Sequence, residues 1–259
     1  MGVTVVRIAL GFATLSLVPS ARRAILPEDR AKTAALGVLW LAFPLSMFPF
    51  AEQHVSSALA GMLNGATPLF AALVASLLAR QAPSRRVALG LAVGFAGAVL
   101  IALPGLAGLG AMRGQAKGVL MILAALVSYA FAYSLARPLQ QRNGALPVVW
   151  RALGAALVLT LPFGAPAIAH AHWTAASLGS LIALGALGTG VAYAILATAA
   201  GRLGATRASS NNFIIPVVSL LLGVLVRHEQ VSTISIAGAG VCLLGAWLIR
   251  PVAIESPRP

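Results

Sequence analysis

The chain has 259 residues, of which 59% are hydrophobic and only 9% are charged, and its mean hydropathy is +0.94. A soluble domain carries about 25% charged residues, so this composition excludes a soluble globular protein and indicates a membrane protein with many spans. The formal net charge of +13 would suggest nucleic-acid binding in a soluble chain. Here the basic residues sit in short loops, so we expect no nucleic-acid partner and interpret the charge as a topology signal.

Nine segments are apolar enough to cross a bilayer, for which a helix needs about 20 residues. In chain order they cover about residues 3–19, 33–50, 56–79, 87–105, 118–136, 147–168, 176–198, 208–226 and 233–250. The loops between them are short and marked by Gly, Pro and Arg. The sequence therefore predicts an all-α fold, a polytopic membrane helix bundle.

Two of these segments contain the same pair of residues. Asn64 lies four residues before Pro68 in the third segment, and Asn212 lies four residues before Pro216 in the eighth. The two asparagines are 148 residues apart, and so are the two prolines. Two pairs of glycines share this separation: Gly90 with Gly238, and Gly97 with Gly245. Four matches at one separation indicate an internal repeat.

The distribution of lysine and arginine predicts the topology. One alternate set of loops, together with the C-terminal tail, carries 13 of these residues, whereas the other set carries three. The positive-inside rule places the first set and the C-terminus in the cytoplasm. The third segment then runs inward and the eighth runs outward, so the repeats are inverted, which is a layout of secondary transporters.

This topology divides the chain into a first repeat over residues 1–112 and a second over residues 113–259. Segments one to four match segments six to nine, while the segment at 118–136 has no counterpart in the first half. We therefore expect a five-plus-five design from which the first helix is missing.

The prolines predict helix kinks at Pro68 and Pro216. Each removes the N–H that would bond to the carbonyl of the asparagine four residues earlier, and in lipid such a carbonyl needs another partner. Two kinked, polar helices in matching halves indicate a transporter's substrate site. The alternative is that the prolines only bend the helices and the asparagines Asn64 and Asn212 only bond between them.

Further polar residues lie inside the segments. Tyr129 and Tyr133 are four residues apart and share one helix face, and with Ser128, Tyr193 and the two asparagines they could line a neutral, partly aromatic substrate cavity. Hydrogen bonding between helices is the alternative. No Asp, Glu or Lys falls at the middle of a segment, which argues against a buried acid relay.

Two acids are candidates for proton coupling. Glu52 and Glu229 lie in outer turns near His54 and His228, and histidine changes charge near neutral pH. Capping of a turn, or plain solvation, is the alternative for both acids.

The other charged residues have simpler interpretations. Glu28, Asp29 and Glu255 are expected to be solvated, and Arg7 and Arg151, near segment ends, are expected to extend their charges to the lipid head groups. The glycines of two segments should serve close helix packing. These glycines are Gly90 and Gly94 in one segment and Gly238, Gly240 and Gly245 in the last.

No enzyme is indicated by the motifs present. The sequence lacks H-E-x-x-H, G-x-S-x-G and a Walker A motif. We predict no metal site and no cofactor.

Residues 50–78 and 90–103 resemble the end of the first half of an EamA-type transporter, of the drug/metabolite transporter superfamily, and residues 186–249 resemble the end of its second half. Tyr193, the turn Arg202-Leu203-Gly204-Ala205, Pro216 and Glu229 fit the family pattern. The resemblance implies ten helices in two inverted halves. The family's Gly-Glu turn departs from its pattern in both halves: it reads Arg80-Gln81 in the first and His228-Glu229 in the second.

The sequence thus predicts a secondary transporter of a small metabolite or drug in the inner (plasma) membrane of a bacterium, working as an exporter by alternating access. Its partners would be membrane lipids and a small-molecule substrate, with a homodimer left open. The alternative is a non-transporting truncated membrane protein, or a subunit that needs a partner chain.

Overall fold

The structure is a computed structural model that describes residues 1–106, 112–171, 173–195 and 214–249. Within these ranges the secondary structure is helical. The α-helices are α1 (Gly2–Ser16), α2 (Arg30–Gly37), α3 (Phe43–Ala51), α4 (Ser57–Asn64), α5 (Thr67–Ala79), α6 (Arg85–Leu106), α7 (Met112–Asn143), α8 (Ala145–Ala169), α9 (Ala175–Ile182), α12 (Ile214–Leu225) and α13 (Thr233–Leu248). Two short 3₁₀ helices are η1 (Pro19–Arg22) and η2 (Pro27–Asp29), and two π-helical segments are η3 (Val38–Ala42) and η4 (Ala183–Val191).

The helices confirm the predicted polytopic membrane bundle. Six helical stretches of the described residues are long and apolar enough to cross a membrane, and three shorter apolar helices accompany them. Two of the stretches run through a π-helical segment: α2, η3 and α3 form one, and α9 and η4 belong to another. Of the predicted segment at 208–226, the structure describes the part in α12.

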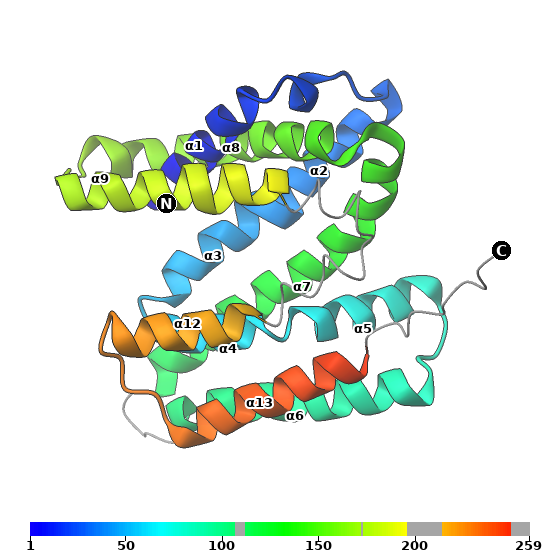
Figure 1. Cartoon of the computed structure of the whole chain (residues 1–259), viewed down its shortest axis with the longest axis vertical. Coiled ribbons are helices and arrows are strands. Elements are labelled where there is room, and N and C mark those ends of the chain that lie inside the picture. Colours follow the sequence, from blue (N-terminus) through cyan, green and yellow to red (C-terminus); the bar gives the residue numbers. More distant parts are fainter. Residues whose placement is uncertain (107–111, 172, 196–213, 250–259) are drawn as a thin grey trace.

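The helices form two groups joined by long diagonal elements (Figure 1). One group contains α1, α8 and α9, the other contains α4, α5, α6, α12 and α13, and both α3 and α7 run between the groups. Each group has its own buried apolar cluster, and Tyr129 of α7 packs against both clusters. Both groups combine helices from the two predicted repeats, so neither repeat packs as a separate unit.

The two copies of the proline-containing segment face each other. Three contacts of α12 with α4 and the residue that follows α4 define the pairing: Gly61 with Ser219, Gly65 with Pro216, and Ala58 with Gly223. Residue numbers rise along α4 where they fall along α12, so the two helices are antiparallel, as an inverted repeat requires. The first-half copy therefore contacts the second-half proline directly.

The helices that follow, α6 and α13, pack in the same antiparallel way through their glycines. A Cβ atom on Gly245 would lie 2.3 Å from the backbone nitrogen of Gly94, and one on Gly97 would lie 2.3 Å from that of Cys242. Small residues allow this approach of two backbones, so the predicted packing role is confirmed for Gly90, Gly94, Gly238 and Gly245. It is wrong for Gly240, which has open space where a side chain would lie.

The predicted solvation of Asp29 is also wrong. Its side chain is completely buried, forms an ion pair with Arg142 at the end of α7, and accepts a hydrogen bond from Asn143 Nδ2 at 2.7 Å. The loop before α2 folds back onto α7, and a buried carboxylate requires such partners. Glu28 stays 68% exposed, as expected, and Glu255 lies outside the described residues.

Candidate functional site

Five aromatic side chains from four elements meet where the two helix groups join. Trp40 of η3 contacts Tyr193 and Tyr133 edge-on, with ring centroids 5.2 and 6.0 Å apart. Tyr133 stacks on Tyr129 of the same α7 face, at 6.3 Å, and Tyr129 contacts Phe48 of α3 at 6.3 Å. The structure thus brings together the three predicted tyrosines, and we call the five residues the aromatic cluster.

The two π-helical segments position this cluster. The 148-residue separation carries residues 38–42 of η3 onto 186–190, which lie within η4. π-helical turns are rare and occur frequently at functional sites. Here η3 carries Trp40, and Tyr193 lies just beyond the end of η4. Because four of the five paired residues differ, and only Leu39 matches Leu187, these matching segments were not recognised from the sequence.

Ser128 has a local partner. Its hydroxyl donates a hydrogen bond of 2.7 Å to the carbonyl of Leu39, between α7 and the residues of η3. The side chain is buried, at 6% exposure. This geometry fits the alternative of bonding between helices, and a substrate role for Ser128 stays a prediction.

The chain breaks its helix at the predicted first-half position. α4 ends at Asn64, and α5 begins at Thr67 with Pro68 in its first turn. The Thr67 hydroxyl donates to the carbonyl oxygen of Asn64 at 2.6 Å, which gives the carbonyl freed by Pro68 a partner. In the second half Pro216 lies in the first described turn of α12, while Asn212 lies outside the described residues.

Glu229 caps a helix of the opposite repeat. Its carboxylate oxygens accept hydrogen bonds from the backbone nitrogens of Ser57, at 3.1 Å, and Ala58, at 2.8 Å, at the start of α4. The carboxylate is 12% exposed and forms an ion pair with Arg227. A negative charge at a helix N-terminus is stabilising, so this acid holds α4 in place.

Glu52 lies nearby, directly after the last residue of α3. Although the residue is exposed overall, partial withdrawal of its carboxyl from water raises the pKa of Glu52 above its ordinary value. The negative charge of Glu229 adds to this rise, and the positive charges of Arg227 and Arg7 oppose it. Glu52 therefore binds a proton more tightly than a solvated glutamate does.

The sequence suggested that the Arg7 side chain extends to the lipid head groups, but in the structure it turns to another helix. Its Nε donates a hydrogen bond of 2.9 Å to the hydroxyl of Thr189, which is completely buried in η4. Thr189 lies four residues before Tyr193 of the aromatic cluster. The sequence analysis assigned Arg7 to the lipid head groups and not to the candidate site, although an arginine within an apolar segment is itself a signal of function.

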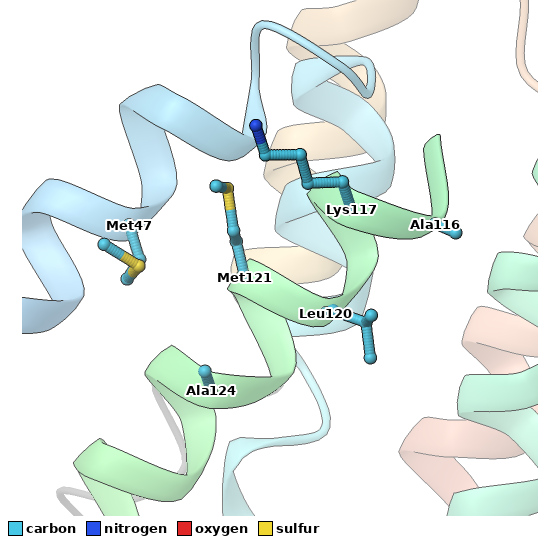
Figure 2. A pocket seen from close by; sticks show the side chains of 6 residues that line it. All are labelled: Met47, Ala116, Lys117, Leu120, Met121 and Ala124. Atoms are coloured by element: carbon cyan, nitrogen blue, oxygen red, sulfur yellow. The ribbon is translucent and has the colours of Figure 1, made fainter. Parts of the chain in front are cut away.

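An open apolar hollow of about 510 Å³ lies apart from these residues, between α3 and α7. Figure 2 shows Met47 of α3 across from Met121 of α7. Its lining consists of Met47, Ala116, Lys117, Leu120, Met121 and Ala124, and none of the predicted site residues contributes to it. In the described part of the chain, no three His, Cys, Asp or Glu side chains gather as a metal site would require.

Comparison with known proteins agrees with this architecture. The profile of the EamA-like transporter family matches residues 1–103 and 116–250. An uncharacterized transporter of Archaeoglobus fulgidus is 23% identical over 222 residues, which is 86% of this chain and 78% of that protein. A protein of Streptantibioticus cattleyicolor named as a probable terminal-alkyne amino-acid exporter is 26% identical over 249 residues, covering 95% of this chain and 81% of its own length.

A third relative, an uncharacterized transporter of Bacillus subtilis, is 26% identical over 243 residues, or 92% of this chain and 78% of that protein. The family profile covers both halves of the sequence, and the relatives align along most of it. The chain belongs to the EamA-like transporter family.

Proposed function

We propose that this protein is a secondary transporter that exports a small metabolite or drug by alternating access between its two halves. The observation that carries the proposal is the antiparallel contact between the two proline-containing segments, Gly65 against Pro216. Broken helices at a repeat interface are where secondary transporters bind their substrates. The family supports transport, and the relative named as an exporter supports the outward direction.

In this proposal the aromatic cluster and the helix break form the substrate site. Tyr129, Tyr133 and Tyr193 would offer ring faces and phenol groups, and Asn64 an amide, in a region that joins the two helix groups. Asn212 and Ser128 belong to the same predicted set. Pro68 and Pro216 would act as the points about which the helices bend.

We assign the proposed proton coupling to Glu52 rather than to Glu229. Both oxygens of Glu229 already accept backbone hydrogen bonds from α4, and its loss would disturb the fold. Glu52 is exposed, and its raised pKa lets it exchange a proton nearer to neutral pH. We place the protein in a bacterial inner membrane with its C-terminus in the cytoplasm.

Transport assays with purified protein in liposomes test the proposal. The liposomes would be loaded with labelled amino acids, nucleosides or cationic dyes, and efflux would be followed after imposing a proton gradient. We expect efflux of at least one class, and replacing Trp40 by Ala should slow it roughly tenfold for a loss of about 1.4 kcal/mol of binding free energy.

Phe163→Ala is the matched control, because Phe163 is an aromatic residue of α8 that is 66% exposed on the outside of the bundle. It should leave efflux unchanged. Wild-type liposomes that release no class faster than empty ones would favour the alternative, a non-transporting protein or a subunit that needs a partner chain.

A further inference from the structure

Arg7 carries a positive charge within an apolar helix. Its Nε is held by the completely buried hydroxyl of Thr189, and Thr189 in turn donates to the carbonyl of Leu184 within η4. Gly11, one turn further along α1, packs on the same threonine, since a Cβ there would lie 2.8 Å from Thr189 Cγ2. These contacts fix the direction of the guanidinium group.

Within the described ranges, no carboxylate forms an ion pair with this charge. Three ion pairs occur among the described residues, and they join Arg142 to Glu28 and Asp29, and Arg227 to Glu229. None of these ion pairs includes Arg7. An arginine inside a membrane span is expensive and normally has an anionic partner or a functional role.

The two Nη groups of the Arg7 guanidinium make no hydrogen bond to any described residue. In the part of the chain that the structure describes, Arg7 makes its hydrogen bond through Nε, and its two Nη groups have no hydrogen-bond partner. The residue is partly exposed rather than sealed in the core. Two parallel N–H groups of this kind match the two oxygens of a carboxylate.

We propose that Arg7 binds the carboxylate of the transported substrate, with the aromatic cluster receiving the apolar part of the same molecule. The substrate class is then a small carboxylate-bearing metabolite, either a free amino acid or a simple organic acid. Thr189, which holds Arg7, lies four residues before Tyr193 in the same stretch of chain, and Tyr193 contacts Trp40 at 5.2 Å. The charge and the rings are thus joined through one short segment, residues 189–193, and we assign them to the two ends of one ligand.

This inference rests on the proposed transport function, but binding tests it separately. We would measure binding to the purified wild-type protein by the shift in its thermal unfolding with four probes. The probes are L-phenylalanine, 3-phenylpropionate, L-phenylalaninamide and 2-phenylethylamine. They share one ring and differ in whether they carry a carboxylate, an amine or both.

We expect the two carboxylates to stabilise the protein and the amide and the amine to have no effect. Arg7→Gln should weaken carboxylate binding roughly tenfold or more, the loss expected for a hydrogen-bonded charge partner, and Arg7→Lys should retain part of it. Arg151→Gln is the matched control, since Arg151 also lies within a span but contacts Trp150 and the carbonyl of Pro147 instead.

Three results would overturn the assignment. The amide could bind as well as the acid, neither acid could bind, or folded Arg7→Gln could bind carboxylates as tightly as the wild type and Arg7→Lys do. Binding of 3-phenylpropionate but not L-phenylalanine would identify an organic acid site, and the reverse an amino-acid site. Carboxylate binding that depends on Arg7 without efflux from liposomes would preserve this site and refute the proposed transport.

Discussion

Among the residues whose structure is described, two that are not glycine adopt a backbone conformation that favours glycine. Arg80, which ends α5, and His228, after α12, have φ values of 51° and 53°. They are 148 residues apart, so the repeat extends to backbone geometry. A side chain in this left-handed region costs about 1–2 kcal/mol relative to glycine, and the family's turn has glycine at both places.

Replacing Arg80 or His228 by Gly should therefore stabilise the protein by about 1 kcal/mol at each site. Thermal unfolding in detergent measures the gain. Arg137→Gly, in the exposed interior of α7, serves as the control and should lose about 1 kcal/mol. A loss at Arg80 and His228 as large as that at Arg137 would refute the argument.

Glu52 should make the stability of the protein depend on pH. Its pKa is raised in the folded protein from the ordinary value of 4.5, so the folded state binds the proton more tightly than the unfolded state does. Stability should then fall as the pH rises from about the ordinary value through the raised one. Glu52→Gln removes this ionisation, so its unfolding temperature relative to wild type should increase across that window.

The measurement is a series of thermal unfolding curves between acid and neutral pH for wild type, Glu52→Gln and Glu28→Gln. Glu28 is 68% exposed, so its replacement should leave the pH profile almost unchanged. Parallel profiles for wild type and Glu52→Gln would show that Glu52 titrates as a solvated acid.

At the scale of elements, the close packing of α6 on α13 has a definite requirement. Gly245 meets the backbone of Gly94, whereas Gly240, on another face of the same helix, meets nothing. Backbone atoms cannot move aside as a flexible side chain can, so a methyl group at Gly245 must separate the helices.

Gly245→Ala should destabilise the protein by about 1–3 kcal/mol through overpacking. Gly240→Ala makes the same chemical change without a contact and should be neutral or slightly stabilising, because alanine favours helix more than glycine does. Unfolding in detergent compares the two variants directly. Equal effects would show that the glycines do not set the distance between α6 and α13.

At the scale of the whole molecule, the charge distribution predicts which loops face the cytoplasm. The loop after α5 contains Arg80 and leads to Arg85 and Arg86, whereas the loop after α8 contains no lysine or arginine. The positive-inside rule therefore assigns them to opposite sides of the membrane. The buried Cys242 is the one cysteine of the chain and can be replaced by serine to give a background for labelling.

In that background, Ala171→Cys should react with a membrane-impermeant maleimide in intact cells, and Gln81→Cys only after the membrane is opened. Both positions are exposed in the structure, so reactivity reports the side of the membrane rather than burial. The opposite pattern would reverse the proposed orientation, and labelling of both in intact cells would refute the two-sided arrangement.

Local chemistry made much of this protein readable from its sequence. The nine apolar segments, the helix break at Pro68 and the antiparallel repeat follow from hydropathy, a missing backbone donor and charge distribution, all of which act along short stretches. The tertiary structure alone decided the rest. Glu229 caps a helix 172 residues away, Arg7 bonds to Thr189 across 182 residues, and Trp40 meets Tyr133 and Tyr193. Such contacts depend on how helices cross, because side chains far apart in the sequence meet only when packing brings their faces together.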